Sequence, residues 1–292
     1  MTSSFGTRLA RAVAARGPVC AGIDPHPQLL DAWGFGDSVR GLAQFCRVAL
    51  DGFAEAAVIK PQVAFFERFG ARGYAVLETV LHDARELGVL TILDAKRGDI
   101  GSTMEGYAQA VLPVGAPLEA DAVTLSPYMG VSAYRSVVDQ AGEAGKGVFV
   151  LALTSNPEGR ALQRAAIDPP GVETVASSII DWCEARNREL FAGEDWGSVG
   201  IVVGATVEDA EVASAGRLPG FSGPILAPGF GAQGASEGDV RARFGAAASR
   251  LVINSSRGLL AAGPNPDALA RSLAQANEEC RTALAGEEDT PA

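Results

Sequence analysis

The sequence predicts an α/β protein whose single catalytic domain, residues 1–285, is a (β/α)8 TIM barrel. The first observation is a series of short apolar stretches rich in β-branched residues, which predict strands at 19–23, 57–59, 89–93, 122–125, 148–153, 200–203, 224–227 and 251–253. The second is helical periodicity between them, as in 73–87, 172–191 and 207–213. Strands that alternate with helices indicate a parallel sheet, and eight such units close into a barrel.

The third observation is that each apolar stretch ends in polar residues. The stretches themselves show no polar alternation, as expected of a sheet covered on both faces. A doubly wound open sheet would not ordinarily place polar residues at the end of every strand. Because barrel enzymes build their sites at these carboxyl ends, we expect one polar mouth formed by Asp24, Lys60, Asp94, Lys96, Asp99, Ser126, Thr154, Ser155, Gln233 and Arg257.

Composition narrows the class of protein. The chain has 292 residues, 47% hydrophobic and 20% charged, with a formal net charge of −11. An acidic chain lacks the basic face that nucleic acid requires, so nucleic acid is not an expected partner. No apolar run approaches the roughly 18 residues that span a bilayer, so no membrane association is expected. The four cysteines have neither metal nor redox spacing, which predicts reduced thiols in a cytoplasmic protein.

Two segments near the ends of the chain have a distinctive composition. Residues 7–16 are amphipathic, rich in arginine and free of acids, as transit peptides are. A surface helix is the favoured interpretation, because Gly17-Pro18 ends the stretch and a strand follows at once. The last residues, 286–292, have the composition of a disordered tail.

The densest charge lies in residues 90–103, at the end of the third strand. Asp94 and Lys96 alternate along the strand and therefore point to the same side, while Asp99 falls on the turn after Gly98. Burying such charges costs several kcal/mol unless they pair. The cluster is therefore either a structural ion pair or a functional site.

The seventh and eighth strand ends suggest a phosphate site. Residues 229–234, GFGAQG, match G-x-G-x-x-G, but a dinucleotide fold needs this motif early and an acid about 20 residues later. We therefore expect a glycine loop that binds phosphate through backbone N–H groups and the side chain of Gln233. Arg257 and Gly258 open a short helix after the eighth strand, and barrels frequently bind phosphate between these two units.

The motif at 94–103, Asp-Ala-Lys-Arg-Gly-Asp-Ile-Gly-Ser-Thr, resembles the D-x-K-x-x-D-I-x-x-T signature of the orotidine 5′-phosphate decarboxylase family. Other strand ends agree over about residues 5–275, namely Gly-Ile-Asp at 22–24, Lys-Pro-Gln at 60–62, Thr-Ser-Asn-Pro at 154–157 and Arg-Gly at 257–258. The Lys-Pro-Gln and Thr-Ser-Asn-Pro forms resemble the longer bacterial branch of the family.

The resemblance implies that orotidine 5′-monophosphate (OMP) loses CO2 to give uridine 5′-monophosphate (UMP), the last step of UMP synthesis, without metal or organic cofactor. It implies a homodimer with shared sites, in which Asp99 and Thr103 reach the partner's substrate. The remaining roles that it implies are ribose binding by Asp24 and Lys60, contact with the reacting group by Asp94, Lys96 and Asp99, base binding by Ser155, and phosphate binding by Gln233, Arg257 and Gly258.

Two alternatives stay open on the sequence. A related barrel enzyme that acts on a phosphorylated keto-sugar would use the same motif to hold Mg²⁺, but it predicts an acid at the second strand end, where this chain has Lys60. A non-catalytic nucleotide-binding barrel would bind UMP without consuming OMP, and the presence of Lys96 counts against it. Residues 156–170 are longer than a compact barrel needs and have no assigned role beyond a lid or a dimer contact.

Overall fold

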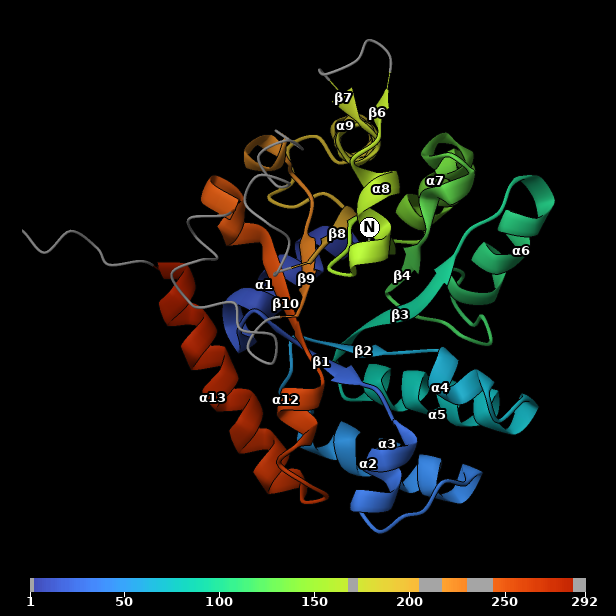
Figure 1. Ribbon diagram of the computed structural model, residues 1–292, viewed down its shortest axis with the longest axis vertical. Coiled ribbons are helices and arrows are strands. Elements are labelled where there is room, and N and C mark those ends of the chain that lie inside the picture. The colour runs from blue at the N-terminus through green and yellow to red at the C-terminus, as the bar shows by residue number, and fades with distance from the viewer. Residues whose placement is uncertain (1–2, 168–172, 205–216, 230–243, 286–292) are drawn as a thin grey trace, which may run out of the picture.

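A ring of parallel strands forms the centre of the protein (Figure 1). The computed structural model describes residues 3–167, 173–204, 217–229 and 244–285. The ring closes in the order β1-β10-β9-β8-β5-β4-β3-β2, and every neighbouring pair is parallel. This confirms the predicted (β/α)8 barrel. Its strands are β1 (Val19–Ile23), β2 (Val58–Pro61), β3 (Leu90–Arg97), β4 (Ala122–Leu125), β5 (Gly147–Leu153), β8 (Val199–Val203), β9 (Ile225–Pro228) and β10 (Leu251–Ser255).

Several strands continue further than their apolar stretches predict. Lys60 and Pro61 still pair with Gly22 and Ile23 of β1. The third strand runs on through its charged residues to Arg97, although its register shifts between Leu93 and Arg97. A strand ends where backbone pairing ends, so a polar side chain alone does not terminate it. Lys60, Asp94 and Lys96 therefore lie on the strands and not in the loops after them.

Helices surround the ring on its outer side (Figure 1). Those predicted at 73–87 and 172–191 correspond to α5 and α9, whereas the one predicted at 207–213 lies outside the described residues. The helices are α1 (Phe5–Arg16), α2 (Pro27–Ala32), α3 (Val39–Gly52), α4 (Ala64–Glu67), α5 (Ala71–Glu86), α6 (Gly101–Val111), α7 (Arg135–Glu143), α8 (Arg160–Gln163), α9 (Val175–Leu190), α12 (Arg257–Leu260) and α13 (Pro266–Ala285). Short 3-10 turns are η1 (Pro127–Met129), η2 (Val131–Tyr134), η3 (Pro157–Gly159), η4 (Leu218–Gly220) and η5 (Gly245–Arg250).

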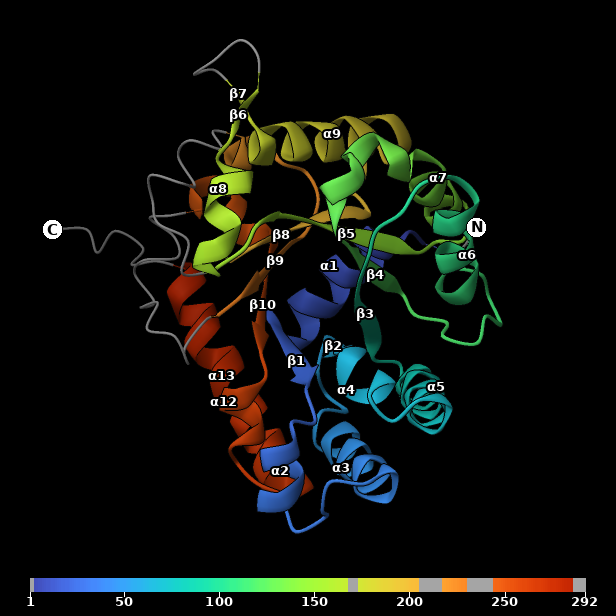
Figure 2. The same cartoon turned by 45° about the vertical axis from the view of Figure 1, so that its right-hand side comes forward.

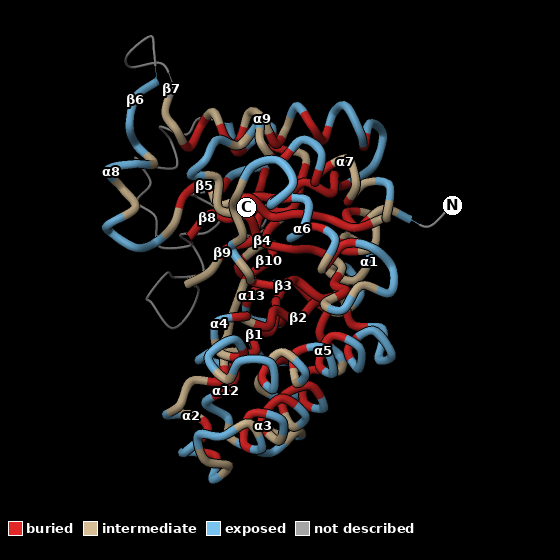
Figure 3. The backbone as a smooth tube through the Cα atoms, turned by 90° about the vertical axis from the view of Figure 1, so that its right-hand side faces the viewer, coloured by how far each residue is buried: buried red, intermediate tan, exposed pale blue. Residues whose placement is uncertain are grey.

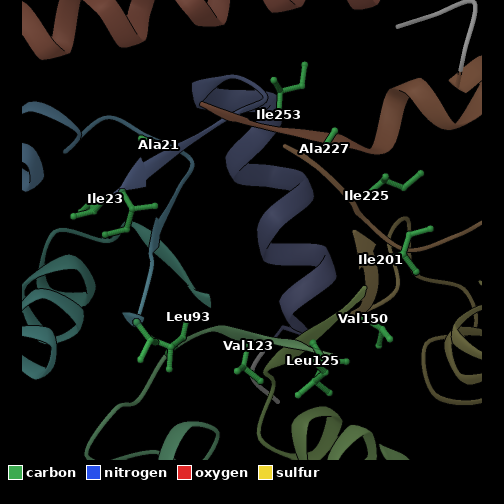
Figure 4. Packing of buried hydrophobic residues seen from close by; sticks show 14 of the residues in the cluster. Ala21, Ile23, Leu93, Val123, Leu125, Val150, Ile201, Ile225, Ala227 and Ile253 are labelled. Atoms are coloured by element: carbon green, nitrogen blue, oxygen red, sulfur yellow. The ribbon is translucent and has the colours of Figure 1, made fainter. Parts of the chain in front are cut away.

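Successive side chains along each strand belong alternately to two separate apolar cores. Figure 4 shows one set, including Leu93, Val123 and Ile201, pointing away from the ring toward the surrounding helices. The other set fills the barrel interior and comprises Cys20, Val58, Ile92, Ala122, Phe149, Val202, Leu226 and Val252 together with Phe5, Leu9 and Trp196. Because both faces are buried, the strands are continuous apolar runs, and Figure 3 shows them buried beneath partly exposed helices.

The amino-terminal helix α1 closes one end of the barrel, so it is more than the predicted surface helix. Its Phe5 and Leu9 are fully buried in the interior core, where the Phe5 ring meets Phe149 edge to face at 6.0 Å. Arg8 pairs with Asp121 at 2.6 Å, just before β4 begins. The helix therefore seals the end where the strands start and leaves the opposite end for a site.

The chain between β5 and α9 forms a projection above the barrel (Figure 2). After η3 and α8 comes a small antiparallel hairpin of β6 (Ala166–Ile167) and β7 (Glu173–Thr174). This segment contains the predicted insertion at 156–170, of which residues 168–170 lie outside the described residues. The tail predicted at 286–292 also lies outside them. Within the described part of the chain, none of the helices combines the length and the apolar character that crossing a membrane requires.

The Phe5 side chain fills the end of the barrel that α1 closes. We expect Phe5→Ala to lower the free energy of unfolding by about 3–5 kcal/mol, because it leaves a cavity in a fully buried core. Denaturant unfolding measures the change. The matched control is Arg11→Ala, an exposed position of the same helix, which should change stability by less than about 0.5 kcal/mol. Equal losses of stability in the two variants would show that Phe5 does not stabilise this end of the barrel.

Candidate active site

The alternation of side chains along three neighbouring strands builds a polar layer at the open end of the barrel. Val58, Ile92 and Ala122 point into the interior core. The residues two positions later, Lys60, Asp94 and Thr124, therefore point to the same side one layer higher. All three are buried, with relative exposures of 5%, 6% and 1%.

Asp94 is the centre of this layer. Lys60 Nζ donates to its Oδ2 at 2.8 Å, and Gln62 Nε2 donates to the same oxygen at 2.9 Å. Lys96 Nζ donates to Oδ1 at 2.6 Å, and the Thr124 hydroxyl donates to Oδ1 at 2.9 Å. Each carboxylate oxygen thus accepts one bond from an ammonium and one from a neutral donor, which compensates for the loss of water.

The charges of the layer shift one another's ionisation. Burial alone raises the pKa of Asp94, but the charges and hydrogen bonds of Lys60 and Lys96 outweigh it and bring the pKa well below its usual range. Burial likewise acts to lower the pKa of Lys60, and the negative charges of Asp94 and Asp24 outweigh it, so the net shift is upward. The site therefore holds Asp94 as a carboxylate and Lys60 as an ammonium.

Lys96 has an unusual backbone. Among the described residues it is the one non-glycine residue with positive φ, at 45°. This left-handed conformation costs about 1–3 kcal/mol for such a residue and persists only where surrounding contacts hold it. This left-handed residue lies within the stretch where the register of β3 shifts. The half-exposed Lys96 side chain extends to the Asp94 carboxylate.

A cavity of about 420 Å³ lies above this layer. Lys60, Asp94 and Lys96 line one side of it, while Leu151, Val202, Leu226 and Pro228 form an apolar wall on the strands opposite. A pocket with an apolar wall and a few convergent charges suits a flat ring that carries an anionic group.

The segment after β5 forms a third wall of this cavity, contributed by Thr154, Ser155, Asn156, Gly159 and Gln163. Gln163 of α8 holds this segment in place through two hydrogen bonds to Thr154. The Gln163 Oε1 accepts the Thr154 N–H at 3.0 Å, and the Gln163 Nε2 donates to the Thr154 hydroxyl at 2.7 Å. Exposed Ser155 thus faces the same cavity as Lys96. The insertion gains a role from this geometry, since its first half borders the cavity.

Asp24 lies at the end of β1 beside a second cavity of about 510 Å³, which Lys96 also borders. Its Oδ1 is buried, and no described residue hydrogen-bonds to it. Asn254 Oδ1 and Ser256 Oγ, at the end of the adjacent strand β10, are in the same state. Because buried polar atoms are normally paired, these acceptors are suited to hydroxyl donors of a ligand or to ordered water.

The predicted phosphate residues are described only in part. Arg257 and Gly258 are exposed at the start of α12, directly after β10, as predicted. The Arg257 carbonyl accepts the N–H of Ala261 at 3.0 Å. Among the described residues, the Arg257 guanidinium forms no ion pair and is exposed. Gln233 lies outside the described residues, as do residues 230–234 of the glycine loop.

Asp99 and Thr103 do not join the cluster around Asp94 within one chain. Asp99 Oδ1 instead accepts the N–H of Ile100 at 2.8 Å, and Thr103 is exposed on α6. The turn before Asp99 requires glycine, because a Cβ on Gly98 would lie 2.4 Å from the Ser126 carbonyl oxygen.

Three residues of the site were not predicted from the sequence, namely Gln62, Thr124 and Gln163. Gln62 follows Lys60 by two positions, and that spacing places it beside the same carboxylate. Thr124 is the one polar residue within the apolar stretch at 122–125, which is a usable signal. Gln163 gives no such signal, because its role depends on how α8 folds back over β5.

The family model described as "Orotidine 5'-phosphate decarboxylase / HUMPS family" matches residues 17–273. An orotidine 5′-phosphate decarboxylase of Salinispora arenicola (strain CNS-205) is 51% identical over 285 residues, 97% of this chain and 99% of that relative.

Solved structures agree with this match. A structure from Streptomyces avermitilis ma-4680 has a TM-score of 0.90 at 47% identity and covers 98% of this chain and 97% of its own. The Leishmania donovani OMP decarboxylase has a TM-score of 0.74 at 31% identity, over 97% of this chain and 99% of its own. On the family model and these near full-length relatives, the chain belongs to the orotidine 5′-phosphate decarboxylase / HUMPS family.

Proposed function

We propose that this protein decarboxylates OMP to UMP and CO2, as the last step of UMP synthesis. The observation that carries the proposal is the Lys96 ammonium, which Asp94 holds at 2.6 Å on the border of a cavity of about 420 Å³. The curated relatives of similar length bear the name of this activity. Among the described residues that line the cavity, Lys96 is the one whose backbone has a positive φ and whose side chain carries a transferable proton.

The chemistry follows from where charge moves. The bond between the ring carbon and the carboxylate breaks, CO2 leaves, and the electron pair stays on the ring carbon. No π system of the ring accepts that pair, so electrostatics must lower the barrier. An ammonium at this carbon favours the charge after it has moved there, and it then supplies the proton that completes UMP. Lys96 performs both roles in the proposal and regains its proton from water.

The surroundings of Lys96 contribute to the same step. Asp94 pairs with the Lys96 ammonium and lies where a substrate carboxylate would be repelled. The apolar wall of Leu151, Val202 and Leu226 offers a carboxylate no hydrogen bonds, whereas neutral CO2 needs none. Both features destabilise the bound substrate carboxylate more than they destabilise the product. This effect is called ground-state destabilisation.

The remaining substrate groups are assigned by position. Asp24, whose Oδ1 lacks a partner among the described residues, and Lys60 hold the ribose hydroxyls. Ser155 holds the edge of the pyrimidine, since it faces the same cavity as Lys96. Gln233, Arg257 and Gly258 hold the phosphate. Phosphate binding far from the ring carbon then provides energy that organises the reacting end.

A magnesium-dependent reaction on a phosphorylated keto-sugar fits the described residues less well. Lys60 and Lys96 already balance the charge of Asp94, and both ammoniums would repel a divalent cation at that carboxylate. We therefore propose a reaction that needs neither metal nor organic cofactor.

We further propose a homodimer in which Asp99 and Thr103 complete the partner's site. Within one chain, Asp99 makes no described contact with Lys96, and Thr103 is exposed. Exposed apolar side chains follow the ends of both β3 and β4, namely Ile100 next to Asp99, and Tyr128 and Met129 in η1. Exposed apolar residues grouped in this way are typical of an interface.

We also propose that the protein is located in the cytoplasm. Burial raises the pKa of the Cys20 thiol to about 12 and also raises the pKa values of Cys46 and Cys183, so these side chains persist as unreactive thiols. Reduced cysteines are usual in the cytoplasm.

The proposed reaction is tested by following OMP consumption and UMP formation by the purified protein. We expect turnover that EDTA does not reduce, and a fall in kcat of about 10⁴-fold in Lys96→Ala, because that variant loses both charge stabilisation and the proton donor. The control is UMP affinity of the same variant, which should stay measurable. UMP binding by the wild type without OMP consumption would instead indicate a non-catalytic barrel, and loss of turnover with EDTA a metal enzyme.

Arg257 is tested through KM. Removing a bidentate cation from a phosphate costs about 1.5–3 kcal/mol, so Arg257→Ala should raise KM for OMP by about 10- to 100-fold. The matched control is Arg271→Ala, an exposed arginine on α13, which should leave KM unchanged. An unchanged KM in Arg257→Ala would place the phosphate elsewhere.

Sharing of sites between subunits is tested by complementation. Lys96→Ala and Asp99→Ala homodimers should each be inactive, whereas a mixture with exchanged subunits should recover about a quarter of wild-type activity, since half of the dimers are hybrids with one intact site each. Native mass spectrometry of the same mixture, with one variant isotopically labelled, confirms subunit exchange. Absence of recovery despite exchange would show that each chain completes its own site.

A further inference from the structure

Thr124 of β4 contacts the backbone of Lys96 directly and the ammonium of Lys96 through Asp94. Its Oγ1 accepts the backbone N–H of Lys96 at 2.9 Å. The same hydroxyl donates to Asp94 Oδ1 at 2.9 Å, and that oxygen also accepts from Lys96 Nζ at 2.6 Å. Thr124, Asp94 and Lys96 thus form a closed ring of hydrogen bonds that includes the backbone and the ammonium of one lysine.

The direction of each bond in this ring is determined by chemistry. A backbone N–H can only donate, so the Thr124 oxygen must accept from Lys96. The single hydroxyl proton is then free to point to the Asp94 carboxylate, which can only accept. Thr124 is 1% exposed and borders the cavity beside Asp94 and Lys96, so its hydroxyl group lies at the floor of the site. One hydroxyl group of β4 therefore bonds two residues of β3 at once.

The ring lies at the strained point of the site. Lys96 has φ of 45°, and the register of β3 against β4 shifts between Leu93 and Arg97. In a regular strand the backbone N–H of Lys96 would bond a carbonyl of the ladder, but here it bonds a side chain. A neighbouring contact between the Ser126 N–H and the Arg97 carbonyl at 2.8 Å ends the irregular stretch.

We propose that Thr124 is a positioning residue, whose hydroxyl holds the Lys96 backbone in its left-handed conformation and thereby places the ammonium at the reacting carbon. This inference rests on the proposed function and adds a residue to it that neither the motif nor the family resemblance assigns. The side chain of Lys96 is half exposed, with 47% relative exposure, and would otherwise move among many conformations. Thr124 acts through Lys96 and Asp94 and donates no proton to the substrate.

Two substitutions separate the hydroxyl from the shape of the side chain. Thr124→Val keeps the branched shape suited to β4 and removes the hydroxyl, whereas Thr124→Ser keeps the hydroxyl and removes the methyl group. We expect Thr124→Val to lower kcat by about 10- to 100-fold, because a small displacement of a catalytic group costs rates of this order. KM for OMP and the affinity for UMP should stay close to their wild-type values. Thr124→Ser should recover most of the wild-type kcat.

A second measurement does not depend on turnover. Backbone hydrogen exchange in peptides that contain Lys96 should be faster in Thr124→Val than in the wild type or Thr124→Ser, because the Lys96 N–H loses its acceptor. Absence of OMP turnover by the wild type would overturn the proposed function, and exchange would still decide whether Thr124 holds Lys96.

Three outcomes would overturn the inference. The first is wild-type kcat and wild-type exchange in Thr124→Val. The second is an equal loss of kcat in the valine and serine variants, which would show that keeping the hydroxyl does not preserve kcat. The third is a parallel loss of UMP affinity, which would make Thr124 part of general binding. Should Thr124→Val not fold, the same comparison is made between Thr124→Ala and Thr124→Ser.

Discussion

One buried carboxylate organises the open end of this barrel. Asp94 accepts four hydrogen bonds from side chains of β2, β3 and β4 and from Gln62 just beyond β2, two of them from ammonium groups. Removing two charged groups from water costs several kcal/mol per ion unless the geometry of their pairing is good. Here three neighbouring strands must close side by side before all four donors meet. The barrel and the charge cluster thus depend on each other.

The mouth of the barrel is divided into a charged half and an apolar half. The charged half comes from β2, β3 and β4, and the apolar wall from β5, β8 and β9. A substrate that spans both halves meets a positive charge on one side and a surface without hydrogen bonds on the other. For a reaction that converts a carboxylate into neutral CO2, this division favours the product side of the bond that breaks.

Stability and chemistry occupy opposite ends of the same ring. Helix α1 closes the end where the strands start with Phe5 and Leu9, beneath the interior core. The polar layer lies at the other end, where backbone strain at Lys96 is held by contacts from β4. A rigid and well-packed barrel can retain such strain, because its strands cannot relax independently. This separation lets the site keep an unfavourable backbone without loss of the fold.

Much of this arrangement could be predicted from the sequence, because local patterns determine it. Eight apolar stretches alternating with helices specify the barrel. The predicted meeting of Asp94 and Lys96 is also observed, although regular alternation is broken at Lys96. The order of residues along the chain also puts Arg257 and Gly258 at the start of a helix after the last strand. These features need only near neighbours in the sequence.

The tertiary structure alone decided how residues from different strands meet. Nothing local links Thr124 to Asp94 or Gln163 to Thr154, since the first pair joins two strands and the second requires the insertion to fold back. The left-handed backbone of Lys96 was equally hidden, because that conformation is unfavourable locally and exists only through contacts with β4. A sequence pattern records which side chains can pair, and the closing of the barrel determines which of them do.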